Sequence, residues 1–301
     1  MFTRQTKNKG ICITVMAICA CMCALCGLSA CQIQTNTQVN TNLTPKIDGK
    51  ATMHEGVLTV GINTSNSPYG GTNSDKETVG LDVDVAAAIA QELGLKLQIV
   101  DVEASGRNAL TNSQIDVALG LTKSGTSDKI SYSDSYISDG PSLFCLSGNK
   151  PESIQAVASE ASDGSAKILV QADTTSAMKV QESIGADKVV AMPTLQAAFD
   201  ALAKGEQKYL VTDAAIGDYF ARSYSNIVRM DYLGADCVSP IYAVTLSQNT
   251  ALSSGVNAAV RTLNTNGVIR VIVAKWLGED GKTLLSSKVD ISKLPAKAFG
   301  L

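Results

Sequence analysis

The stretch that decides the fold of this chain is Val79-Gly80-Leu81-Asp82-Val83-Asp84-Val85-Ala86, which runs on to Leu93 and Gly94. It is typical of a turn that opens a helix, because Asp82 or Asp84 can accept hydrogen bonds from the free N–H groups of a first helical turn. Apolar residues then recur at four-residue spacing and form one stripe, at Val85, Ile89 and Leu93. Gly94 is a suitable helix end.

Alternating apolar and polar residues predict a strand on each side of this helix, at 58–63 and at 95–100. A strand, a helix and a strand of these lengths form a βαβ unit, which implies parallel strands and a right-handed crossover. The same order recurs along the chain. Further strands are expected at 115–119, 143–146, 167–170, 188–191, 209–213 and 241–246, and further helices at 107–110, 174–184, 195–204, 251–264 and 268–277.

Composition limits the classes of function. A length of 301 residues suffices for about two domains, and an apolar content of 45% supports well-filled cores. The formal charge of −3 argues against a nucleic-acid partner, which normally meets a basic patch. The single histidine, His54, argues against a His-rich metal site and against a Ser-His-Asp triad. We therefore expect no metal, no cofactor and no catalytic residue.

The first thirty residues have the pattern of a secretory signal rather than of a folded domain. Three basic residues precede the uncharged apolar run 11–27, and small residues follow it. The alternative is an uncleaved membrane anchor, since about 20 apolar residues can span a bilayer. The ending Leu28-Ser29-Ala30-Cys31 resembles the lipobox of bacterial lipoproteins. That resemblance implies cleavage before Cys31 and attachment of a lipid to its thiol.

Five of the eight cysteines fall within residues 1–30, so the mature chain would keep Cys31, Cys145 and Cys237. This is no disulfide framework. Cys145 and Cys237 each precede an expected crossing between lobes, so we expect them to lie close together. Export to an oxidising space would permit a bond between them, and two separate thiols are the alternative.

The expected organisation is a signal peptide at 1–30, a flexible tether at 31–55, two lobes and a tail at 284–301. Lobe 1 comprises 56–146 and 242–283, and lobe 2 comprises 147–241. The turn-rich run 147–151 marks the first crossing between the lobes. Two crossings would let each lobe move nearly as a rigid body about a hinge.

From about Leu58 to Gly278 the chain resembles the extracytoplasmic solute-binding proteins of ABC transporters, in the family that mostly binds polar amino acids (family 3). Five segments carry the resemblance in order: Gly80-Leu81-Asp82-Val83-Asp84-Val85, Ser133-Asp134-Ser135-Tyr136, Asp173-Thr174-Thr175-Ser176, Val211-Thr212-Asp213, and Gly267 to Trp276-Leu277-Gly278. The resemblance implies an α/β, two-lobed periplasmic-binding-protein-like (type II) fold with a ligand cleft between the lobes.

Several residues are candidates for that cleft. Asp213 stands where a strand meets a helix, at the sheet edge where α/β folds bind ligands, and the family uses this position for the ligand's α-amino group. A plain helix cap is the alternative. Thr174, Thr175 and Ser176 offer hydroxyls and N–H groups to an anion, or cap their helix. Tyr69 covers the ligand's side chain in this interpretation, or simply packs. Asn63, at the end of the first strand, completes the ligand-binding set for these segments.

One departure from the family pattern concerns the ligand's carboxylate. The family usually carries an arginine before the segment at 133–136, and this chain has none between Val117 and Asp139. The sequence therefore predicts a clamp made by Lys123 with Thr122, or by Arg107. The alternatives are that Lys123 is solvated and that the ligand has no carboxylate.

These features predict a lipid-anchored, extracytoplasmic and monomeric binding protein, not an enzyme. It would deliver a small polar solute, first of all an amino acid, to an ABC permease. One alternative is a dehydratase of the kind known on this fold, although acid–base catalysis needs a titrating group at the cleft and the lone histidine lies in the tether. Another alternative is a ligand-sensing module without transport.

Overall fold

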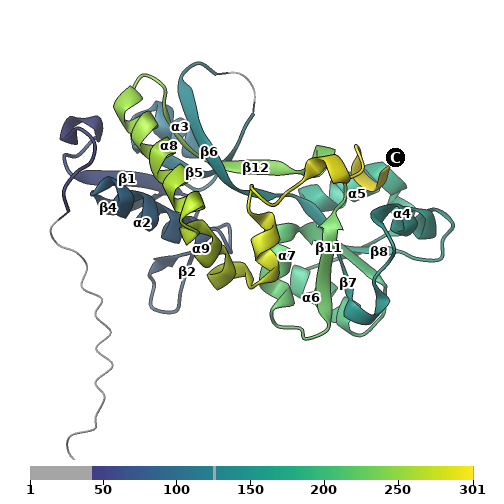
Figure 1. Cartoon of the computed structure of the whole chain (residues 1–301). Helices are drawn as coiled ribbons and strands as arrows, with labels where there is room; N and C mark the ends of the chain where they lie inside the picture. Colours follow the sequence, from purple (N-terminus) through teal and green to yellow (C-terminus); the bar gives the residue numbers. More distant parts are fainter. Residues whose placement is uncertain (1–42, 125–126, 301) are drawn as a thin grey trace, which may run out of the picture. The chain divides into compact units, whose positions relative to one another are not determined.

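The computed structural model describes residues 43–124 and 127–300. These residues form two mixed five-stranded sheets, each covered by helices, which we call lobe 1 and lobe 2 (Figure 1). The sheet of lobe 1 has the order β4 (Lys96–Asp101), β1 (Val57–Ile62), β5 (Val117–Thr122), β12 (Ser239–Leu246) and β6 (Ile130–Asp139). Its helices are α2 (Leu81–Leu93), α3 (Gly106–Thr111), α8 (Thr250–Thr265) and α9 (Val268–Leu277). A two-stranded ribbon, β2 (Gly71–Thr72) with β3 (Thr78–Val79), precedes α2.

Lobe 2 has the strand order β11 (Ile227–Tyr232), β7 (Pro141–Leu146), β10 (Tyr209–Asp213), β8 (Ile168–Gln171) and β9 (Val189–Met192). Its helices are α4 (Ile154–Ser162), α5 (Thr175–Ile184), α6 (Leu195–Ala203) and α7 (Ala214–Ala221). The expected two-lobed α/β class is thus confirmed. None of the helices in the described ranges is long and apolar enough to cross a membrane.

The opening βαβ unit is confirmed, because β1 and β4 pair in parallel on either side of α2. Gly94 ends the helix in the left-handed conformation (φ 69°) and donates its N–H to the carbonyls of Ala90 and Gln91. The expectation that Asp82 or Asp84 caps the helix is wrong. Gly80 is the cap residue and makes no side-chain bond, so both aspartates lie inside the helix. There they bind other elements instead.

The first crossing between the lobes lies earlier than the sequence predicts. Strand β6 of lobe 1 ends at Asp139, and β7 begins at Pro141 in lobe 2, so the chain changes sheets at Gly140. The strand expected at 143–146 in lobe 1 therefore belongs to lobe 2, where Cys145 pairs with Tyr209. The turn-rich run 147–151 lies at the far end of β7 and leads into α4.

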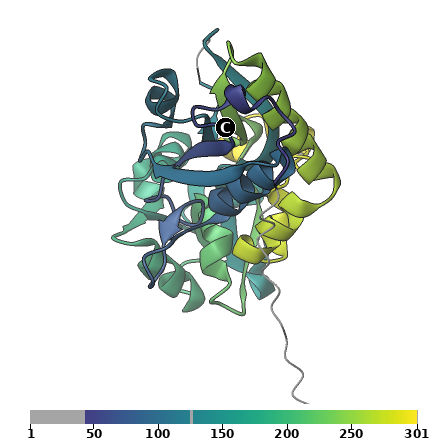
Figure 2. The same ribbon diagram turned by 90° about the vertical axis from the view of Figure 1, so that its left-hand side faces the viewer.

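Apolar side chains cover both faces of each sheet, as in other sheets with parallel strands. In lobe 1, α2, α8 and α9 pack together over one face, and Figure 2 shows these helices side by side. The residues of α3 pack on the other face. In lobe 2, α4 and α5 pack with one cluster, and α6 and α7 pack with the other.

The tail forms a third connection between the lobes, where the sequence predicts only two crossings. Leu284 and Leu285 are buried in the lobe 1 core, whereas Ala298 and Phe299 are buried in the core of lobe 2. Two short 3-10 segments, η5 (Asp280–Leu284) and η7 (Ala298–Gly300), begin and end this passage, drawn in yellow in Figure 1. The tail lacks helical periodicity because only its two ends contribute buried apolar residues.

Candidate functional site

A cavity of about 530 Å³ opens where the two lobes meet. It lies beyond the carboxyl ends of β5, β8 and β10, where α/β sheets bind small molecules. Its volume is in the range of small-molecule sites. Six of the nine predicted ligand-binding residues line it: Tyr69, Thr122, Thr174, Thr175, Ser176 and Asp213.

Asp213 is the last residue of β10 and precedes α7, yet its side chain makes no capping hydrogen bond. Its Oδ1 accepts a hydrogen bond from the hydroxyl of Ser176 at 2.5 Å. Another carboxylate caps α7 instead, since Asp139 Oδ1 accepts from the N–H of Ala215 at 3.0 Å. Burial raises the pKa of Asp213. This carboxylate therefore faces the cavity with its second oxygen unbonded by any residue that the structure describes.

The start of α5 brings three predicted residues to the cavity. Thr174 caps the helix, because its hydroxyl accepts from the N–H of Ala177 at 3.1 Å and donates to the Gln171 carbonyl at 2.9 Å. Ser176 orients Asp213, and Thr175 is exposed. Among the described residues, no backbone partner accepts from the N–H groups of Thr175 and Ser176. A helix N-terminus of this kind attracts an anionic group.

Tyr69 is buried and its hydroxyl donates to Asp139 Oδ2 at 2.6 Å. Burial and the neighbouring carboxylate of Asp139 raise the pKa of this phenol. Tyr69 thus packs in the core and also lines the cavity, and its contact with a ligand side chain stays a prediction.

The structure does not bring Lys123, Arg107 or Asn63 to the cavity. Arg107 Nη1 donates to the Tyr132 hydroxyl at 2.7 Å, and its Nη2 donates to the carbonyl of Thr122. The ammonium of Lys123 lies over the rings of Tyr132 and Tyr242, 5.6 and 5.0 Å from their centroids.

Successive side chains of a strand point to opposite faces, so Thr122 at the cavity turns Lys123 away from it. The amide oxygen of Asn63 accepts from the N–H of Ser65 in its own loop. The predicted clamp by Lys123 or Arg107 therefore has no support in this geometry.

Sequence reasoning missed three charged residues of the cavity: Asp139, Lys179 and Asp236. Asp139 ends β6 at the first crossing, and Asp236 precedes the return to lobe 1. The only sequence signal for Asp139 is its place before Gly140 and Pro141, where a turn ends a strand. Among the described residues, no cluster of His, Cys, Asp and Glu is arranged to hold a metal ion.

The two cysteines of the described chain, Cys145 and Cys237, are both free and buried, and both belong to the same apolar cluster of lobe 2. The Cys237 thiol donates to Asp236 Oδ1 at 3.3 Å, and burial raises its pKa to about 12. The structure thus agrees with the alternative of two thiols. Cys31 lies outside the described residues.

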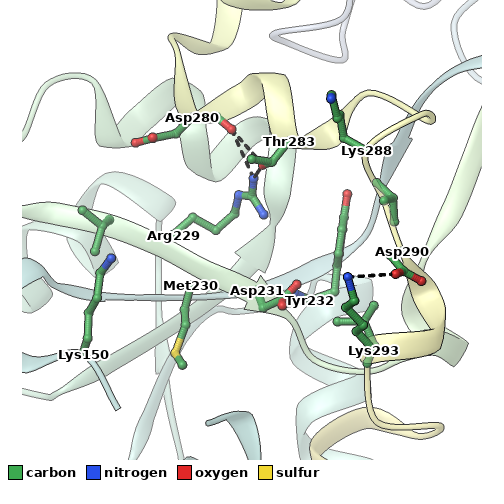
Figure 3. Close-up of a pocket in the computed structure, with 13 residues that line it drawn as sticks. Lys150, Arg229, Met230, Asp231, Tyr232, Asp280, Thr283, Lys288, Asp290 and Lys293 are labelled. Atoms are coloured by element: carbon green, nitrogen blue, oxygen red, sulfur yellow. Dashed lines mark hydrogen bonds and ion pairs between the residues drawn. The ribbon is translucent and has the colours of Figure 1, made fainter. Parts of the chain in front are cut away.

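A second pocket, of about 370 Å³, lies between β11 and the C-terminal tail (Figure 3). Its Arg229 is buried and donates through Nε to both carboxylate oxygens of Asp218, at 3.0 and 3.1 Å. Arg229 also donates to the hydroxyl of Thr283, and Lys293 pairs with Asp290 at 3.1 Å. These four charged residues are paired within the protein, so we interpret the pocket as a packing gap between lobe 2 and the tail and not as a ligand site.

Residues 58–279 match the family described as bacterial extracellular solute-binding proteins, family 3. The glutamine-binding protein GlnH of an ABC transporter from Bacillus subtilis is 27% identical over 74% of this chain and 82% of its own. The L-cystine-binding protein TcyA of the same organism is 26% identical over 85% and 94%. A polar amino acid ABC uptake transporter substrate binding protein from Streptococcus thermophilus superimposes with a TM-score of 0.64 at 20% identity, over 78% of this chain and 89% of its own.

Proposed function

Because the chain belongs to family 3 of the bacterial extracellular solute-binding proteins, we propose that it captures an amino acid for an ABC importer. The two relatives from Bacillus subtilis are named as a glutamine-binding and an L-cystine-binding protein, and neither is named as an enzyme. The observation that carries the proposal is Asp213, a carboxylate that faces the cavity without capping its helix. Such a carboxylate suits the α-ammonium group of an amino acid.

Capture would work by closure of the lobes. Tyr69 and Thr122 of lobe 1 and Thr175 and Asp213 of lobe 2 line the same cavity. A ligand that touches both sets has more contacts when the lobes are close together, so it favours the closed state. The N–H groups at the start of α5 would receive the ligand's carboxylate in place of the arginine that is usual in the family.

The proposal includes anchoring through Cys31. The segment Leu28-Ser29-Ala30-Cys31 supports it, and lasting attachment requires at least two acyl chains. In cells fed a labelled fatty acid, the protein should carry the label and Cys31→Ala should not. A labelled Cys31→Ala variant would contradict the anchor while leaving the binding function intact.

The test of binding is a thermal-shift screen of the chain without residues 1–30 against the common amino acids. A ligand that binds only the folded state stabilises it by about 2.7 kcal/mol at a hundredfold excess over Kd. At least one amino acid should therefore raise the melting temperature by several degrees. No shift with any of them, confirmed by calorimetry, would contradict the proposed ligand class.

A further inference from the structure

The charges of the cavity do not balance. Its described lining holds three carboxylates, those of Asp139, Asp213 and Asp236, against one cation, Lys179. Lys179 Nζ lies 3.5 Å from Asp236 Oδ2, so these two residues form an ion pair. Two carboxylates, Asp139 and Asp213, are left without a positive partner among the described residues.

Both of these carboxylates have only neutral partners. Asp139 accepts hydrogen bonds from Tyr69 and from the N–H groups of Gly140 and Ala215, and Asp213 accepts one from Ser176. A carboxylate that leaves water without a cation carries a large desolvation cost. Accordingly, burial raises the pKa of both, and the charge of Asp213 raises that of Asp139 further.

Within residues 43–124 and 127–300, no cation outside the cavity lining forms an ion pair with Asp139 or Asp213. Arg107 is bound to Tyr132 and Thr122, and Lys123 lies over aromatic rings, so neither lines the cavity. A cationic solute can therefore balance Asp139 and Asp213 while both carboxylates are charged. This reasoning rests on the proposed function, since it takes the same cavity as the binding site.

From this charge balance we infer that the cavity takes a small solute with two cationic nitrogens, one bound by Asp213 and the other attracted by Asp139. Asp213 offers an unbonded oxygen, whereas Asp139 is held in place by donors from both lobes and acts mainly through its charge. Two classes of compound have two cationic nitrogens at this size, the basic amino acids and the aliphatic diamines. Only the amino acids also have a carboxylate, and the N–H groups at the start of α5 are the donors available for it among the described residues.

Isothermal titration calorimetry on the chain without residues 1–30 tests the inference with five probes: L-lysine, L-ornithine, Nε-acetyl-L-lysine, L-glutamine and cadaverine. Acetylation removes the second charge and keeps the carbon chain. The acetylated probe lacks the charge that Asp139 attracts, so the doubly cationic probes should bind at least about tenfold more tightly than it does.

Variants supply the matched comparison. Asp139→Asn removes the charge, and its amide oxygen can still accept from the N–H groups of Gly140 and Ala215. Affinity for L-lysine should therefore fall about tenfold or more. Asp134→Asn, on the same strand but exposed and paired with Arg261, should leave affinity unchanged. Thermal melting of each variant establishes that it is folded, and the acetylated probe needs no variant at all.

The outcomes separate the two proposals. If glutamine or acetyl-lysine binds as tightly as lysine, the inference of a doubly cationic solute is wrong and the proposed amino-acid function stands. If cadaverine binds and neither basic amino acid does, the inference of a doubly cationic solute stands and the proposed amino-acid function is wrong. If none of the five binds, the inference of a doubly cationic solute fails, and the screen against the common amino acids decides the amino-acid function separately.

Discussion

Asp82 shows how an apparent capping residue becomes part of the core. It is 2% exposed, and its Oδ1 accepts a hydrogen bond from the Tyr136 hydroxyl at 2.7 Å, which in turn accepts from the N–H of Gly120. Burial raises the pKa of Asp82 to about 7. The folded state therefore holds a proton that the unfolded state has lost above about pH 4.

Stability should thus fall with rising pH on account of this group. Between pH 4 and 7 the native chain binds more protons than the unfolded one, so the free energy of unfolding decreases as pH rises. From pH 5 to pH 8 the loss from Asp82 is roughly 2–3 kcal/mol. Asp82→Asn stays neutral and still accepts from Tyr136, so urea unfolding should show a loss that is smaller by about that amount. An unchanged pH dependence in this variant would contradict the raised pKa.

Removing the charge of Asp213 should lower the affinity for the ligand and should not lower the stability of the fold. Asp213→Asn keeps the size of the side chain, and its loss of charge should weaken the ligand found by the screen at least about tenfold. The variant should melt no lower than the wild type, because it removes a charge that repels Asp139. Calorimetry and thermal melting check the two statements separately. Unchanged affinity for an ammonium-bearing ligand would exclude Asp213 from the site.

At the scale of elements, the two crossings between the lobes pass very close together at Gly140. A Cβ at this position would lie 2.2 Å from the carbonyl oxygen of Cys237. Gly140→Ala should therefore cost about 2 kcal/mol or more in unfolding free energy, as overpacking against backbone does. The measurement is equilibrium denaturation in urea.

Gly148 provides the matched control, at the far end of β7. A Cβ at Gly148 meets no atom within 4 Å, so Gly148→Ala should change stability by less than about 0.5 kcal/mol. If both variants were equally stable, the two crossings would not be packed as the structure has them.

The elements themselves were largely predictable from sequence, and their assignment to lobes was only partly so. Hydrophobic periodicity and end signals such as Gly94 are local, and they located α2 and the strands around it. The lobe of β7 depends on its pairing with β10, some sixty residues away, which no local pattern encodes. The short irregular passage at Gly140 gave no signal comparable to the turn-rich run at 147–151.

The candidate site divides in the same way. Asp213 and the start of α5 were predictable because they are motifs at strand ends, where α/β sheets bind ligands. Lys123 does not line the cavity, because nearness in sequence to Thr122 does not tell which way a side chain points. Arg107, a candidate through the family resemblance, binds Tyr132 and Thr122 instead. Asp139 was missed because its importance comes from contacts with Tyr69 and Ala215, one from each lobe.

At the scale of the whole molecule, the tail joins the two lobes as a third connection. Arg229 of lobe 2 is paired with Asp218 and donates to Thr283 at the start of the tail. Phe299 at the other end is fully buried among residues of α4 and α5, and its N–H donates to the Leu233 carbonyl at 3.0 Å. Lobe 2 thus completes its core with a side chain that arrives from lobe 1.

Because Phe299 packs in the core of lobe 2, its removal should destabilise lobe 2 more than lobe 1. Phe299→Ala should cost about 3 kcal/mol of unfolding free energy, since it opens a cavity in a packed core. Amide hydrogen exchange should rise in α4 and α5, which contact the tail, well before it rises in α2 and α8 of lobe 1. Ile291→Ala is the matched control, because Ile291 lies in the same tail but is 55% exposed. Equal loss of protection in both lobes would mean that the tail stabilises the molecule as one unit, and no loss would mean that it does not anchor lobe 2.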